Sequence, residues 1–234
     1  MPVLTISINH AGYVDKEQAI SGMYFSIEKG ELVGVIGPNG AGKSTMIKTI
    51  LGLVDKMDGE VKFAKGTKYA YIPEHPTYYP ELTLWEHIEL VKAVNEMEDQ
   101  NYEERAHDLL TLFRLEEAKH EFPSAHSKGM QQKLMIILAV LTKPQLYIVD
   151  EPFIGLDPKA IKDFLLLLEN ERKKGVAILM STHVLDTAEK ICDRFLLINN
   201  GNMIAKGTLT QLQQASIVDG SLMDCFYELM DQSS

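Results

Sequence analysis

Apolar residues occur in two patterns along the chain, and each predicts a different kind of strand. Every second residue is apolar in 4–8 and again in 23–27. Because successive side chains of a strand point to opposite faces, this period of two predicts half-buried antiparallel strands near the N-terminus. By contrast, 32–36, 146–149 and 176–180 are almost continuously apolar, as expected of strands buried on both faces.

Helices are predicted between these continuous runs. Apolar residues recur at helical spacing in 44–51, and the pattern stops at Gly52. A second helix begins at an Asp-Pro start signal, covers 157–174 and closes at Gly175. The alternation of buried strands and helices predicts an α/β core.

The segment 76–140 has a different character. Thr83 and Glu86 have the spacing of a capping box, and apolar residues follow at helical spacing through Val91. Helical sequence continues to Leu115 and again over 128–141. We therefore predict an all-helical insertion in the α/β core.

The rest of the chain completes the organisation. Apolar segments 195–198 and 203–205 flank "NNGN", a hairpin signal, and 222–230 predicts a short terminal helix. The predicted regions are the first part of the α/β core, the helical subdomain, the second part of the core and a C-terminal tail, at 1–75, 76–140, 141–207 and 208–234.

The composition restricts the classes of binding partner and the compartment that we expect for this chain. The chain has 234 residues, 45% of them hydrophobic, and a net charge of −10, which argues against nucleic acid or an anionic lipid surface. Only two cysteines occur, Cys192 and Cys225, without metal-type spacing, so a reducing compartment is expected. No basic-then-apolar leader precedes the first strand, and the longest apolar run, 134–141, is short. We expect a protein that neither crosses a membrane nor is exported.

The clearest chemical motif lies between the first continuous strand and the helix after it. "GPNGAGKST" fits the phosphate-binding loop, in which backbone N–H groups surround phosphate oxygens. Lys43 would contact the β- and γ-phosphates, and the Ser44 hydroxyl would ligate Mg²⁺. The alternative is a glycine-rich turn that binds nothing. The predicted ATP-binding residues of the loop are Gly37, Pro38, Asn39, Gly40, Ala41, Gly42, Lys43, Ser44 and Thr45.

An acidic pair follows the second continuous strand. Asp150 would lie at the carboxyl end of that strand, where it could hold Mg²⁺. Glu151 could accept a proton from an attacking water. These two motifs alone leave the reaction open between hydrolysis and phosphoryl transfer to a small acceptor.

Further motifs resemble those of ATP-binding cassette (ABC) subunits over essentially the whole chain. "HSKGMQQK" is similar to the signature segment, with Ser127 and Gly129 in retained positions, "GLDP" matches the loop after the catalytic Glu, and "STH" ends in a switch histidine, His183. Tyr13 stands where the family has an aromatic residue that stacks on adenine. The resemblance implies an α/β fold: a P-loop NTPase (RecA-like) core with an N-terminal antiparallel β subdomain and an inserted α-helical subdomain.

In this family the signature helix faces the γ-phosphate held by the other subunit, so the resemblance implies that two chains close around two ATP molecules. It also implies that Glu151 is the base and that His183 contacts the γ-phosphate. Each residue has a structural alternative: Tyr13 as a surface aromatic, His183 as a buried histidine, and Ser127 with Gly129 as an ordinary helix cap.

Two positions depart from the family pattern. Glu74 stands where most members have the Gln that links Mg²⁺ and water to the membrane partner, and Lys128 replaces the usual third-position Gly. Our hypothesis is that these opposite charges compensate across the closed dimer. The alternative is that Lys128 points into solvent and Glu74 only binds the membrane partner. The segment 52–71 is also short, which implies a trimmed antiparallel subdomain.

The motifs together most resemble the ATPase half of Ecs-type systems. This implies an ATPase, with ATP and Mg²⁺ as ligands, that powers a separate integral membrane permease. The resemblance implies export of peptides or other hydrophobic substrates, or support of membrane proteolysis. The ATPase would form a homodimer or a pseudo-symmetric dimer. It would be cytoplasmic and held on the membrane surface through the permease. The alternatives are a regulatory cassette ATPase not coupled to transport and a phosphate-loop kinase of a small metabolite.

Overall fold

The computed structural model describes residues 1–97 and 100–232; residues 98–99, inside the predicted helical insertion, and 233–234, at the end of the predicted tail, lie outside the described residues. Within this part of the chain nine strands form one sheet, in the order β4-β1-β2-β9-β8-β3-β7-β6-β5. The strands are β1 (Leu4–Tyr13), β2 (Lys16–Ile27), β3 (Leu32–Ile36), β4 (Lys56–Phe63), β5 (Tyr69–Ile72), β6 (Leu146–Asp150), β7 (Ala177–Thr182), β8 (Arg194–Asn199) and β9 (Asn202–Gly207). The helices are α1 (Lys43–Ile50), α2 (Leu84–Val94), α3 (Tyr102–Leu112), the 3₁₀ turn η1 (Pro123–Ala125), α4 (Lys128–Leu141), α5 (Pro158–Lys173), α6 (Leu185–Ile191), α7 (Leu209–Ser216) and α8 (Leu222–Gln232).

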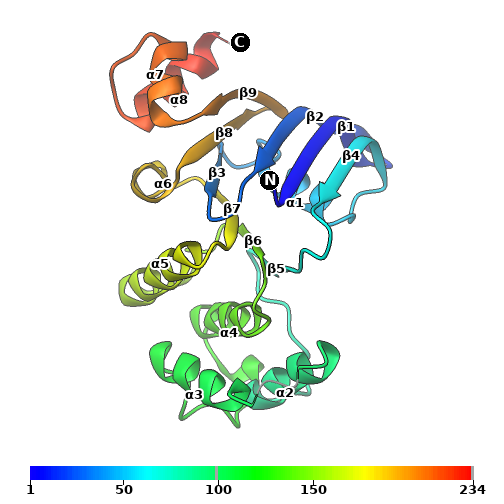
Figure 1. The fold of residues 1–234 in the computed structure, drawn as a ribbon, viewed down its shortest axis with the longest axis vertical. Helices are drawn as coiled ribbons and strands as arrows, with labels where there is room; N and C mark the ends of the chain where they lie inside the picture. The colour runs from blue at the N-terminus through cyan, green and yellow to red at the C-terminus, as the bar shows by residue number, and fades with distance from the viewer. Residues whose placement is uncertain (98–99, 233–234) are drawn as a thin grey trace.

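The N-terminal strands make the antiparallel part of the sheet. β1 pairs with β2 on one side and with β4 on the other (Figure 1). Leu4, Ile8 and Met23 are fully buried, which confirms the predicted alternation. The hydrophobic pattern does not predict β4, because its residues are mostly exposed and its pairing with β1 defines it.

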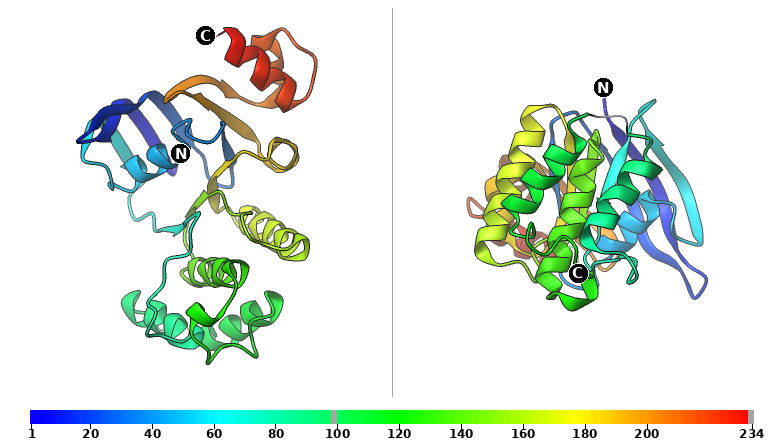
Figure 2. Two further views of the ribbon diagram at one scale, coloured as in Figure 1. Left: turned by 180° about the vertical axis from the view of Figure 1, so that it is seen from behind. Right: turned by 90° about the horizontal axis from the view of Figure 1, so that it is seen from below.

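The parallel part contains the continuous apolar runs. β8, β3, β7, β6 and β5 are successive parallel neighbours. Alternate side chains of β6 pack on opposite layers: Ile148 joins the core that includes Met46 of α1, whereas Val149 joins the core that includes Phe164 of α5. The sheet is therefore covered on both faces (Figure 2), as the runs predict. Since parallel strands end at one edge, the loops after β3, β6 and β7 come together there.

The predicted hairpin at "NNGN" is confirmed as the β8–β9 turn. Asn200 and Gly201 have φ values of 47° and 79°, the positive angles that two-residue hairpins need. A Cβ atom on Gly201 would lie 2.4 Å from the carbonyl oxygen of Ala19. Next to this contact, β9 pairs with β2 and joins the antiparallel and parallel parts of the sheet.

Helices α2, α3 and α4 form a layer at one end of the molecule, below β5 and β6 in Figure 1. The capping box is present: the Thr83 side chain accepts from the Glu86 N–H, and the Glu86 carboxylate accepts from the Thr83 N–H. The helices predicted in 76–140 are thus confirmed within the described residues. The proposed boundaries of the four regions stay a prediction.

The C-terminal segment forms α7 and α8 against the β8–β9 hairpin, at the opposite end of the molecule (Figure 1). Leu212, Leu222 and Phe226 bury their side chains there with Phe195 of β8. The predicted terminal helix is confirmed as α8, whereas the pattern does not predict the short helices α6 and α7. No helix in residues 1–97 or 100–232 combines the length and apolar character that a membrane span requires.

Candidate functional site

The phosphate loop runs from β3 into α1, and close contacts or positive φ angles require its glycines. A Cβ atom on Gly37 would lie 2.3 Å from the carbonyl oxygen of Ile198, and one on Gly42 would lie 2.9 Å from Ile20 Cγ2. Gly40 and Gly42 also have positive φ, 82° and 108°. Larger residues would force the loop out of this position, so the sequence supplies both the turn and the room for it.

Lys43, the first residue of α1, is buried beneath this loop. Its Nζ atom donates to the carbonyl oxygens of Gly37 at 2.8 Å and Pro38 at 3.2 Å. The same ammonium group lies 3.1 Å from Glu151 Oε1, and both side chains are less than one-tenth exposed. The cation of the loop is thus paired with the carboxylate that follows β6.

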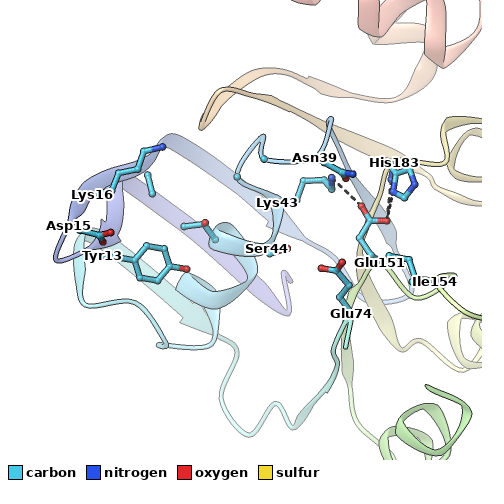
Figure 3. Close-up of a pocket in the computed structure, with 14 residues that line it drawn as sticks. Tyr13, Asp15, Lys16, Asn39, Lys43, Ser44, Glu74, Glu151, Ile154 and His183 are labelled. Atoms are coloured by element: carbon cyan, nitrogen blue, oxygen red, sulfur yellow. Dashed lines mark hydrogen bonds and ion pairs between the residues drawn. The ribbon is translucent and has the colours of Figure 1, made fainter. Parts of the chain in front are cut away.

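Glu151 lies between Lys43 and His183 (Figure 3), because the loops after β3, β6 and β7 meet at this edge of the sheet. His183 Nδ1 is 2.8 Å from Glu151 Oε2. Glu151 Oε1 has the nearby ammonium group but accepts no aligned hydrogen bond among the described residues, so it keeps hydrogen-bonding capacity. The Glu151 backbone has a φ of +44°, an unusual value for a residue with a side chain.

Asp150 is 2% exposed at the end of β6 and is tied to β7. Ser181 Oγ donates to Asp150 Oδ1 at 2.5 Å and accepts from the Glu151 N–H at 3.0 Å. The parallel register places Asp150 beside Ser181. Sequence analysis did not assign Ser181 a role; its position two residues before His183, at the end of a buried strand, is the signal that could have found it.

Lys43, Glu151 and His183 line a pocket of about 500 Å³. It brings together most of the predicted site residues, from elements far apart in the sequence: Tyr13, Asn39, Gly40, Gly42, Lys43, Ser44, Thr45, Glu74, Glu151 and His183. Asp150 lies buried behind Glu151, and Gly37, Pro38 and Ala41 form the base of the loop outside the lining.

The pocket also has lining residues that sequence analysis missed: Asp15, Lys16, Ala19 and Ile154. Tyr13 ends β1, Asp15 lies in the turn and Lys16 begins β2, so the antiparallel strands supply one wall (Figure 3). Charged residues in a β-turn are common, and no pattern in the sequence distinguishes these two from others.

The structure does not bring Ser127 and Gly129 to this pocket. Ser127 caps α4 by accepting from the Met130 N–H at 3.3 Å, as the structural alternative expects. A Cβ atom on Gly129 would lie 2.3 Å from the carbonyl oxygen of Gly155 in the "GLDP" loop. The signature segment and this loop are therefore in direct backbone contact.

The same contact region includes a charged pair. Lys133 Nζ donates to Asp157 Oδ2 at 2.9 Å, and Asp157 Oδ1 accepts from the Ala160 N–H at 2.9 Å. The hydrogen bond from Lys133, followed by that from Ala160, lowers the pKa of Asp157 to about 2. This carboxylate fixes the start of α5 next to α4.

Glu74 follows β5 and lines the pocket below Glu151 in the view of Figure 3. Its side chain is 34% exposed. Burial, together with the charges of Asp150 and Glu74, raises the pKa of Tyr71 to about 12. From α4, Gln132 Nε2 donates to the Pro73 carbonyl oxygen at 2.9 Å, which connects the helical layer to the segment that carries Glu74.

The oxygen donors around the pocket fit Mg²⁺ in chemistry. Ser44, Asp150 and Glu74 offer a hydroxyl and carboxylates, the hard ligands that this ion prefers. No group of three His, Cys, Asp or Glu residues in the described part of the chain could hold a metal by itself. Mg²⁺ usually binds to proteins through one or two carboxylates together with substrate phosphates.

A phosphate loop, an acidic pair after a buried strand and a helical layer in which the start of α4 packs against the "GLDP" loop define a nucleotide-hydrolysing ATPase of the cassette class. The family model for ABC transporters matches residues 20–154. The chain belongs to this family as an ATP-binding subunit, and its α/β fold with antiparallel strands and a helical layer confirms the predicted fold class.

Two relatives from Bacillus subtilis (strain 168) align over nearly their whole length. The uncharacterized ABC transporter ATP-binding protein YthP is 50% identical over 97% of this chain and 96% of its own. The ABC-type transporter ATP-binding protein EcsA is 41% identical over 100% of this chain and 99% of its own. A solved ATP-binding subunit of an ABC transporter superposes with a TM-score of 0.91 at 42% identity, covering 97% of this chain and 99% of that one.

These comparisons confirm the resemblance to Ecs-type ATPase subunits. The chain binds ATP and belongs to subunits that hydrolyse ATP in transporters, pair with membrane permease components and dimerise. They do not favour the regulatory alternative.

Proposed function

We propose that the pocket holds ATP with the adenine on Tyr13 and the phosphates in the loop 37–45. This proposal rests on one observation: Tyr13, Lys43, Glu151 and His183, which come from four separate segments, line the same cavity. Lys43 would leave Glu151 and contact the β- and γ-phosphates, because both partners are anions competing for one ammonium group.

In the proposed reaction, ATP is hydrolysed by water. Glu151 accepts a proton from the attacking water, and His183 contacts the γ-phosphate while its Nδ1 atom holds the Glu151 carboxylate. Ser44, Asp150 and Glu74 would hold Mg²⁺, which supplies positive charge for the phosphate oxygens. In that role Glu74 would offer a carboxylate where most family members have the neutral side-chain amide of a Gln.

The proposed dimer places Ser127 and Gly129 of one chain against the ATP of the other. Ser127 is exposed and lies outside the nucleotide pocket of its own chain, which supports this arrangement. Closure would carry the helical layers α2–α4 toward each other, and hydrolysis would release them.

The transport function we propose is export of peptides or other hydrophobic substrates through a separate permease, with the ATPase on the cytoplasmic face of the membrane. The likeness to EcsA over the whole chain supports an Ecs-type assembly. A homodimer is proposed, with a pseudo-symmetric pair as the alternative arrangement.

Affinity purification of the tagged chain from detergent-solubilised membranes tests this function. We expect a multi-spanning protein to co-purify, and the complex to hydrolyse ATP faster when its substrate is added. A Lys43→Ala chain should co-purify equally but lose the hydrolysis. Recovery of the chain without any membrane protein, with full ATPase activity, would contradict the transport function.

A further inference from the structure

Ser181 connects the two acidic residues of the site through one hydroxyl group. It lies on β7, 0% exposed, beside Asp150 in the parallel register with β6. A hydroxyl has one proton to donate, and here that proton goes to Asp150 Oδ1 at 2.5 Å. The hydroxyl oxygen accepts from the Glu151 N–H at 3.0 Å, so its donor and acceptor functions are used on adjacent residues.

On the Asp150 side, this hydrogen bond decides how a buried carboxylate is oriented. Asp150 is 2% exposed, and a carboxylate oxygen withdrawn from water needs a donor. With Oδ1 held by Ser181, the rotation of the carboxyl group is fixed and Oδ2 has a defined direction. A metal ligand that is pre-oriented in this way loses less freedom when the ion binds.

On the Glu151 side, the same hydroxyl supports an unusual backbone. Glu151 has a φ of +44°, a costly conformation that persists only where surrounding contacts impose it. Its N–H points at Ser181, 3.0 Å from Oγ and 3.2 Å from the carbonyl oxygen. That backbone aims the Glu151 side chain back between Lys43 and His183.

We propose that Ser181 is a positioning residue that sets the Asp150 carboxylate and the Glu151 backbone together. The proposal rests on the proposed function, in which Asp150 serves Mg²⁺ and Glu151 serves as the base. Ser181 does not line the pocket and acts only through these two neighbours. Its loss should therefore affect the Mg²⁺-dependent step and catalysis, while the phosphate loop keeps its own contacts to nucleotide.

The test compares three variants of the 234-residue chain. Ser181→Ala removes the hydroxyl, and Ser181→Cys keeps the approximate volume with a much weaker hydrogen-bonding group. Ser216→Ala is the matched control: Ser216 is 1% exposed, donates to the Gln213 carbonyl oxygen and lies in α7 away from the pocket. Each variant is measured for ATP affinity by calorimetry with EDTA and with Mg²⁺, and for kcat across a Mg²⁺ titration.

We expect both Ser181 variants to lower kcat and to raise the Mg²⁺ concentration for half-maximal activity, each by about 10–100-fold, the range found when a group that orients a metal ligand is removed. Affinity for ATP in EDTA should stay at the wild-type value. Ser216→Ala should match wild type in every measurement.

Two results would overturn the inference. If Ser181→Ala and Ser181→Cys show the Mg²⁺ dependence and kcat of Ser216→Ala, the hydroxyl positions nothing. If they lose ATP affinity in EDTA as much as in Mg²⁺, Ser181 supports the fold in general. Lys43→Ala in the same assay separates the two proposals: unchanged ATP affinity in that variant sinks the proposed function, whatever Ser181 does.

Discussion

Around the phosphate loop, buried charged side chains hold one another in place, whereas the signature segment at the start of α4 is open to solvent. Lys43, Glu151 and Asp150 are each less than one-tenth exposed. Glu151 pairs with Lys43 and contacts His183, and Ser181 connects Glu151 to Asp150. Ser127 and Lys128 are exposed, and Ser127 only caps its helix.

The difference indicates two kinds of functional residue. At the phosphate loop, the geometry is set inside one chain before nucleotide binds, because the buried groups have partners already. At the signature segment, no partner within the described residues uses the exposed surface of Ser127 and Lys128 beyond the cap. Substitutions at the first region should change binding and chemistry in one chain, and substitutions at the second should change association of two chains.

The largest effect is expected at the base. Glu151→Gln keeps the size of the side chain but cannot accept a proton, so kcat should fall by about 10²–10⁴-fold. Affinity for ATP should rise, because the carboxylate that competes for Lys43 becomes neutral. Phosphate release and calorimetry measure both quantities.

The matched control for the base is Glu169→Gln, an exposed glutamate on α5, which should hydrolyse ATP at the wild-type rate. A Glu151→Gln chain with wild-type kcat would place the base elsewhere, with His183 the next candidate. Retained ATP binding in that variant would still support the pocket.

At the phosphate loop itself, Lys43→Ala should weaken ATP binding by about 10–10²-fold, since a charge-assisted contact is worth about 1.5–3 kcal/mol. Lys48→Ala on the exposed face of the same helix is the control and should bind normally. Calorimetry with ATP and Mg²⁺ measures the affinity. Equal affinities for the two variants would mean that the ammonium group contributes nothing to the site.

At the signature segment, Ser127→Ala should leave ATP affinity of the single chain unchanged and reduce ATP-dependent dimerisation. Loss of the cap costs about 0.5–2 kcal/mol of helix stability, so Ser127→Asn, which keeps a capping group, controls for the local effect. Gel filtration in a Glu151→Gln background measures the dimer. If Ser127→Ala dimerises like its parent, the contrast between the two regions fails.

A smaller effect is expected from an interaction between the two regions across the dimer. If Glu74 of one chain and Lys128 of its partner compensate, Glu74→Gln and Lys128→Gly should show a non-additive term of roughly 0.5–3 kcal/mol in dimerisation that shrinks as salt rises. The double-mutant cycle is measured at two salt concentrations in the Glu151→Gln background. Additive effects would leave the two positions independent.

The smallest expected effect concerns the carboxylate at the start of α5. Because the folded-state pKa of Asp157 is about 2, below its unfolded value, its stabilisation is present above about pH 4 and is lost as pH falls toward 2. The group is half exposed, so screening limits the contribution to under about 1 kcal/mol. Urea unfolding should show a shallower loss of stability below pH 4 for Asp157→Asn than for wild type or for the exposed control Asp231→Asn; identical slopes would contradict it.

Much of the fold could be predicted because the burial of side chains requires apolar residues in a regular pattern along the sequence. The fully buried strand β6 gives a continuous apolar run, and the two helix ends at Gly52 and Asp157 use ordinary stop and start chemistry. β4 shows no such pattern because it lies at the sheet edge and its residues are mostly exposed. It is defined by its pairing with β1, which lies far from it in the sequence.

The sequence by itself determined the chemistry available at the site: the loop glycines, the ammonium group of Lys43, the acidic pair and the histidine two residues after Ser181. Local residue order is enough for this, since the loop and the strand ends have characteristic composition.

Only the tertiary structure decided how those groups meet. The parallel register of β6 with β7 places Ser181 against Asp150, and the meeting of three strand ends puts Glu151 between Lys43 and His183. Asp15 and Lys16 reach the pocket because the antiparallel strands stand beside α1. Contacts of this kind join residues far apart in the chain, so they follow from the packing of the sheet and its helices and leave no local pattern.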